Sequence, residues 1–163
     1  MSMEASSNDE KTNKEITMEK QRGTENGDLN DSEELFSNET NKGKENWTLA
    51  INAINLDEKR NHAKEAKKNF ADAYLMATRK YYSVSDDDTE SKKKWLSREI
   101  AMLKNMAFAQ YLSGECIDAL FTAEKVSDMA KEYMLDGNTV TREMEALAKK
   151  IHSELPSLYP DES

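Results

Sequence analysis

Apolar residues recur at steps of three and four through the last two-thirds of the chain, a spacing typical of amphipathic helices. A weak stripe over residues 47–56 is followed by four stronger ones, over residues 63–84, 95–111, 117–134 and 140–155. No proline occurs between residues 47 and 155, and no long run alternates apolar and polar residues. The pattern predicts an all-α domain of antiparallel helical hairpins, arranged as a short solenoid or bundle, without a sheet.

Polar segments between the stripes predict where the helices end. Residues 83–89 include three consecutive aspartates, whose carboxylates are favourable at the N-terminus of the next helix. Gly114 is expected to adopt the left-handed conformation that caps a helix. Residues 136–138 close the third stripe, and Pro156 is expected to stop the fourth. Because these connections are short, consecutive helices should pack antiparallel.

The first 45 residues have a different composition. They hold 12 acidic and 6 basic side chains, only eight apolar residues, and one of the twelve aromatic residues. Such a segment buries too little apolar area to offset the entropy of ordering. We therefore predict a disordered acidic tail over 1–45, a helical domain over 46–156 and a C-terminal tail over 157–163. The Leu35-Phe36 pair is either a docking motif or, as we favour, an incidental apolar pair in a solvated tail.

The charge and hydropathy of the chain argue against several classes of protein. A formal net charge of −9 disfavours broad binding to nucleic acid or to anionic membranes. No stretch approaches the roughly 20 apolar residues that a membrane-spanning helix needs. The first residues lack a basic region followed by an apolar run, so we expect no signal peptide and a cytoplasmic location, with a nuclear one left open.

Few residues suggest catalytic or metal chemistry. His62 and His152 lie on different predicted helices and belong to no metal-ligand motif. Cys116 has no second cysteine to pair with, so we expect a small buried apolar residue. No Gly-x-Gly sequence offers a phosphate-binding loop. We accordingly predict no catalytic residue, no metal and no cofactor, and expect that the protein is not an enzyme.

Residues 105–130 resemble a tetratricopeptide repeat. In such a repeat small residues let two antiparallel helices approach closely, and a glycine forms the turn between them. The matching positions are Ala107, Gly114, Ala119 and Val126. The wider layout, over roughly residues 56–152, resembles the repeat region of immunophilins and related heat-shock co-chaperones. Two departures matter: the first repeat is either one uninterrupted helix or hides its turn, and the third repeat is not recognisable.

The resemblance implies a partner and a set of binding residues. Chaperone-binding members of the family hold C-terminal carboxylates with lysine, asparagine and arginine side chains. Asn105 matches the asparagine of the second repeat, Lys64 or Lys68 lies near the basic position of the first, and Arg142 is the nearest candidate in the third. The implied partner is the C-terminal peptide of a heat-shock chaperone. Family members with prolyl isomerase activity carry it on a separate β-rich domain, so none is implied here.

Basic residues also cluster near aromatic ones, independently of the resemblance. Arg98 follows three consecutive lysines, and Tyr81 lies shortly before them in the sequence. These residues form either a groove for an acidic peptide or the ordinary polar face of two helices. We predict a non-enzymatic adaptor that docks a partner segment on its helices. The alternative is a structural subunit whose small core is completed by another chain or by self-association.

Overall fold

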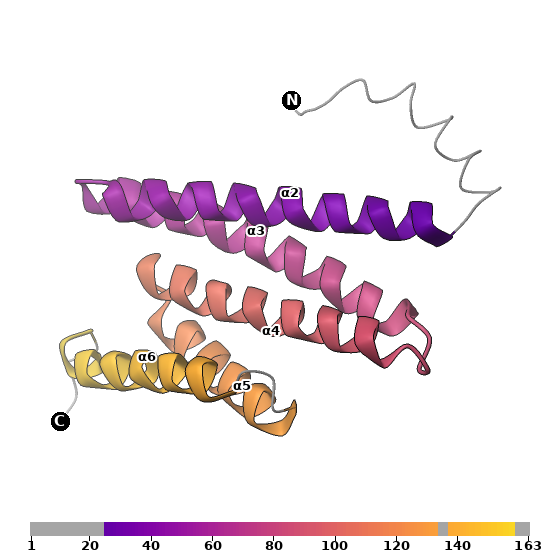
Figure 1. Ribbon diagram of the computed structural model, residues 1–163. Helices are drawn as coiled ribbons and strands as arrows, with labels where there is room; N and C mark the ends of the chain where they lie inside the picture. The colour runs from indigo at the N-terminus through magenta and orange to yellow at the C-terminus, as the bar shows by residue number, and fades with distance from the viewer. Residues whose placement is uncertain (1–24, 134–136, 159–163) are drawn as a thin grey trace, which may run out of the picture. The chain divides into compact units, whose positions relative to one another are not determined.

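The computed structural model describes residues 25–133 and 137–158. These ranges contain five α-helices and no strand, which confirms the predicted all-α fold (Figure 1). The helices are α2 (Glu25–Asn52), α3 (Leu56–Ser83), α4 (Thr89–Leu112), α5 (Cys116–Tyr133) and α6 (Gly137–Leu158). None of the described helices has the length and apolar character needed to cross a bilayer. Described residues from Phe36 onward form one compact unit, and those up to Leu35 belong to a separate one.

Helix α2 corrects the predicted boundary at residue 45. It begins at Glu25, and the predicted tail over 1–24 lies outside the described residues. Phe36 is only 7% exposed, and its ring meets the edge of Trp95 on α4 at a centroid distance of 5.7 Å. This phenylalanine is therefore part of the core and is not available as a docking motif.

The buried face of α2 explains why composition failed to predict this helix. Its buried or half-buried positions follow helical steps of four and three, at Phe36, Thr40, Gly43, Trp47 and Ala50. Three of these five residues are threonine, glycine and alanine, which contribute little to a hydrophobic pattern. The helix packs through small residues, so its apolar stripe is nearly invisible in the sequence.

The helix boundaries have clear local causes. Asn55 caps α3, because its side-chain oxygen accepts a hydrogen bond from the backbone N–H of Glu58 at 3.0 Å. The first stripe is thus one uninterrupted helix, and the turn that precedes it contains neither glycine nor proline. Asp88 caps α4 in the same way, as its carboxylate accepts from the N–H of Ser91 at 3.1 Å.

Two further boundary predictions have different outcomes. Gly114, between α4 and α5, has a φ of 94°, which confirms the predicted left-handed turn. Pro156 does not stop α6, because the helix continues to Leu158. The predicted C-terminal tail therefore begins later than expected, and residues 159–163 lie outside the described ranges.

The helices pack in chain order, α3 on α4, α4 on α5 and α5 on α6 (Figure 1). One core cluster surrounds Trp95 and Phe70 where α2, α3 and α4 meet, and another joins α4, α5 and α6. The small residues Ala107 and Ala119, together with Val126, have no exposed surface and lie in this second cluster. They let α4 and α5 approach closely, as their predicted packing role requires.

Candidate functional site

A groove with aromatic walls lies where α2, α3 and α4 meet. It has a volume of about 320 Å³, within the usual range for small binding sites. It combines three aromatic rings with two lysines and one amide. Its lining residues are Lys44, Trp47, Phe70, Lys104, Asn105 and Phe108. We refer to it below as the Asn105 groove.

The walls of the Asn105 groove are set by close helix packing. Gly43 presents no side chain to Phe70, so α2 lies directly against the phenylalanine ring on α3. Trp47 of α2 packs edge-on against Phe108 of α4, with ring centroids 6.4 Å apart and planes at 61°. Rings from three helices therefore form a rigid apolar surface beside the polar groups.

A chain of side-chain hydrogen bonds fixes α2 against α3 beside this groove. The amide of Asn46 donates to the side-chain oxygen of Asn69 at 2.9 Å. Asn69 in turn donates to the Glu39 carboxylate at 3.1 Å. The first bond joins two neutral amides, and the second joins an amide to a carboxylate. Together they hold the register of the two helices. The position of Lys44 and Trp47 at the groove follows from that register.

The three polar side chains of the groove are hydrogen-bond donors, but they differ in whether another residue is already paired with them. Lys104 donates to Glu143 of α6 at 3.0 Å, which offsets much of its charge. Lys44 is exposed and forms no ion pair with any residue that the structure describes. Asn105 is half-buried between them and can offer its amide N–H groups. The site therefore presents one uncompensated positive charge and an amide next to aromatic surface.

The structure does not bring the other residues suggested by the resemblance to this groove. Lys64 and Lys68 are exposed on α3, and Arg142 is exposed on α6. None of the three lines the groove that contains Asn105. The two lysines that do line it, Lys44 and Lys104, were not among the predicted binding residues.

Arg98 and Tyr81, predicted from the basic and aromatic cluster, make contacts within the fold. The Arg98 guanidinium stacks over the ring of Trp95 at 4.5 Å and over Phe36 at 5.2 Å. Lys92 places its ammonium 4.3 Å from the centre of the Tyr81 ring and donates to the Tyr81 carbonyl at 2.8 Å. These three cation–π contacts pack within the fold, and neither Arg98 nor Tyr81 lines the Asn105 groove.

Sequence reasoning missed most of the residues that line the groove. Lys44 and Trp47 lie on α2, at the edge of the segment interpreted as a tail. The signal that identifies them is the helical spacing of Phe36, Gly43 and Trp47, which becomes visible only when glycine is counted as a packing residue. Phe70 and Phe108 fall on predicted apolar stripes, but periodicity does not distinguish a groove wall from a core position.

Two further titratable groups of the described residues, Cys116 and Glu99, are buried outside the Asn105 groove. Cys116 is buried, which confirms its predicted packing role, and burial raises the pKa of its thiol with a further contribution from Glu154. Burial likewise raises the pKa of Glu99, while Thr78 and Lys125 lower it only in part. In the described ranges, no three His, Cys, Asp or Glu side chains gather in a way that would hold a metal ion.

Comparison of the chain with protein-family models, curated proteins and solved structures finds no match. The resemblance to tetratricopeptide repeats therefore stays a prediction from the sequence.

Proposed function

We propose that this protein is a non-enzymatic interaction module that docks a partner peptide in the Asn105 groove. The observation that carries the proposal is the placement of half-buried Asn105 and two lysines beside three aromatic rings. Donor groups that converge on one point suit a carboxylate. Aromatic walls suit an apolar side chain next to that carboxylate, so the groove favours a short peptide that carries both.

The charge of the groove supports a single carboxylate over a polyanion. Lys104 is already paired with Glu143, so only Lys44 offers an uncompensated charge among the described residues. Nucleic-acid binding normally requires several phosphate contacts from lysine or arginine. The terminal carboxylate of a peptide matches the donors that are present, the Lys44 ammonium and the Asn105 amide.

The resemblance to co-chaperone repeats suggests which peptide this is. Chaperone-binding members of that family hold the C-terminal carboxylates of heat-shock chaperones, and Asn105 is the position here that matches their motif. In this chain Lys44 would provide the positive charge in place of Lys64, Lys68 or Arg142. The protein would then act as a cytoplasmic adaptor for a heat-shock chaperone.

A fluorescence-anisotropy titration tests this proposal. The probe is a labelled peptide with the acidic C-terminal sequence of a heat-shock chaperone, added to the full chain. We expect saturable binding in the micromolar range, because a short peptide has few contacts that can offset its loss of freedom. Lys44→Ala and Asn105→Ala should each weaken binding several-fold. Lys64→Ala, a lysine exposed outside the groove, is the matched control and should leave binding unchanged.

A further inference from the structure

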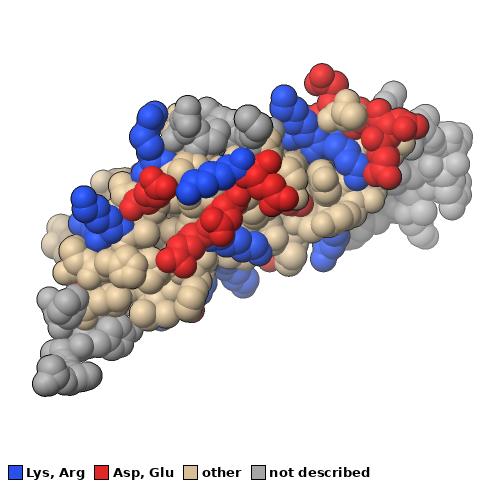
Figure 2. Space-filling model, turned by 90° about the horizontal axis from the view of Figure 1, so that it is seen from below, with Lys and Arg blue, Asp and Glu red and all other residues tan. Residues whose placement is uncertain are grey.

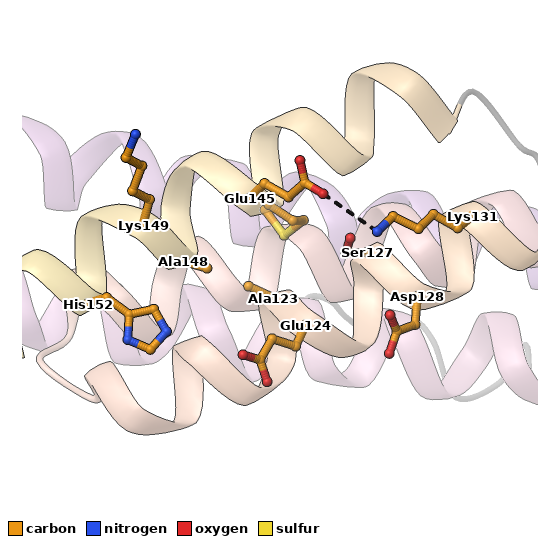
Figure 3. Close-up of a pocket in the computed structure, with 10 residues that line it drawn as sticks. Ala123, Glu124, Ser127, Asp128, Lys131, Glu145, Ala148, Lys149 and His152 are labelled. Atoms are coloured by element: carbon orange, nitrogen blue, oxygen red, sulfur yellow. Dashed lines mark ion pairs between the residues drawn. The ribbon is translucent and has the colours of Figure 1, made fainter.

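A second groove runs between α5 and α6, on different residues from the Asn105 groove. It has a volume of about 480 Å³, and small side chains such as Ala123 and Ala148 line its floor (Figure 3). The buried Met144 also lines it. Lys131, late in α5, pairs with Glu145, early in α6, at 3.5 Å, so the two helices are antiparallel. Within the described ranges, α6 packs only on α5 and briefly on α4, and no helix covers this groove.

The two rims of the α5–α6 groove differ in charge once the Lys131–Glu145 ion pair is set aside. The α5 rim then carries the carboxylates of Glu124 and Asp128, and the α6 rim carries the ammonium of Lys149 and the imidazole of His152. Figure 3 shows His152 pointing toward α5 at the end of the groove where Glu124 lies. None of these four side chains forms an ion pair with another described residue. Seen from below, where α5 and α6 lie, acidic and basic side chains stand next to an uncharged area and do not form a patch of one sign (Figure 2).

An exposed aromatic residue adjoins the acidic rim. Phe121 is 65% exposed and lies on α5 three residues before Glu124, on the same side of the helix. Ile117, one turn earlier, continues this exposed apolar surface. This face therefore combines a recess floored by alanine and methionine with an exposed phenylalanine, and a surface that binds a second copy of itself needs both features.

We propose that the α5–α6 groove is a homodimer interface, occupied by the same groove of a second copy of this chain. In a two-fold arrangement, each contact occurs twice, because the same patch meets itself. The α6 rim of one copy then faces the α5 rim of the other, so Lys149 of each meets Glu124 or Asp128 of its partner. Phe121 of each copy enters the hollow above Ala123 and Met144 of the other. This inference does not rest on peptide binding in the Asn105 groove.

Sedimentation velocity of the full chain tests the dimer. We expect a reversible monomer–dimer equilibrium with a Kd of about 10–100 μM, as suits a small interface with a mixed-charge rim. Phe121→Ala should raise the Kd at least about tenfold, because it removes the main apolar contact. A chain that remains monomeric up to about 500 μM would overturn the proposal and favour a helix of another protein in this groove.

Charge inversion gives a sharper test of the two-fold arrangement. Lys149→Glu and Glu124→Lys each place like charges opposite one another twice in the dimer, so each should raise the Kd about tenfold. In an equimolar mixture of the two variants, both pairs become attractive again, and a heterodimer should form with near wild-type affinity. Absence of this recovery would contradict the pairing of the rims.

Two controls keep the test independent of folding. All inverted residues are on the surface, so circular dichroism of each variant should match the unmutated chain. Lys93→Glu inverts an exposed lysine on α4, outside the groove, and should leave the Kd unchanged. If Lys93→Glu weakens association as much as Lys149→Glu does, net charge and not the α5–α6 groove controls the dimer, and the proposal is wrong.

Discussion

Gly43 of α2 lies so close to Phe70 of α3 that a Cβ atom on Gly43 would stand 2.5 Å from Cε1 of the ring. Two further ring atoms would lie within 2.9 Å, and Phe70 is itself buried, so the ring has little room to move. A glycine is therefore required at position 43 because α2 lies so close to Phe70, and not because of its own backbone conformation. This contact sets the distance between α2 and α3 and places Trp47 and Lys44 at the Asn105 groove.

Gly43→Ala should destabilise the protein even though alanine is the better helix former. The propensity gain is about 1 kcal/mol, whereas overpacking a tight core contact costs about 1–3 kcal/mol. We expect a net loss of about 1 kcal/mol in the free energy of unfolding, measured by urea denaturation. Thr48→Ala, exposed on the same helix, is the control and should be neutral or slightly stabilising. If Gly43→Ala and Thr48→Ala raised the free energy of unfolding equally, Phe70 would not limit how closely α2 approaches α3.

Phe36→Ala tests whether α2 belongs to the folded core. Removal of a buried phenylalanine costs about 3 kcal/mol or more, and here the edge contact with Trp95 is lost as well. The neighbouring Leu35 is 56% exposed, so Leu35→Ala should change stability by less than about 0.5 kcal/mol. Similar small effects for both substitutions would support the original interpretation of this region as a tail.

Glu99 introduces a pH dependence into stability. It is 6% exposed, and its Oε2 atom accepts no hydrogen bond from the described residues. Because burial raises its pKa in the folded state, the ionised form is disfavoured by folding. The contribution of Glu99 to stability is therefore greatest below the unfolded pKa of about 4.3 and is lost as the pH rises through the folded pKa.

Glu99→Gln should accordingly stabilise the protein at neutral pH, by about 1 kcal/mol, because a neutral amide costs less to bury than a carboxylate with one oxygen that accepts no hydrogen bond. The advantage should shrink as the pH is lowered toward 4, where wild-type Glu99 becomes protonated. Urea denaturation of both proteins between pH 4 and pH 8 measures this trend. Glu65→Gln, at an exposed site on α3, should show no such trend. A constant difference across this pH range would mean that Glu99 is not the titrating group.

The sequence was sufficient for four of the helices because their core positions are mostly apolar and recur at helical spacing. In α4 these residues are large, as at Trp95, Ile100 and Leu103, whereas in α3 they are mostly alanine. The buried face of α2 relies on Thr40, Gly43 and Ala50, whose fit depends on the shape of α3 and α4. That complementarity is a tertiary property, so a pattern that counts only apolar side chains does not report it.

Asn105 is the one residue of the groove lining that is also among the predicted binding residues. Asn105 was singled out through its family resemblance, whereas the lysines expected to accompany it lie elsewhere on the surface. Lys44 reaches the groove because Gly43 and Asn46 fix α2 against α3. A basic residue can be assigned to a groove only when the register between helices is known, and the sequence does not determine that register.

The most direct test of peptide docking is a thermodynamic cycle between Asn105 and the terminal carboxylate of the chaperone peptide. Four Kd values are measured, for the unmutated chain and Asn105→Ala, each with the free-acid peptide and its C-terminal amide. If Asn105 donates to that carboxylate, Asn105→Ala weakens the binding of the free-acid peptide several-fold and leaves the binding of the amide nearly unchanged. The coupling energy between the two groups is then about 1 kcal/mol or more. Equal effects on both peptides, or no binding by the unmutated chain, would contradict the proposed function.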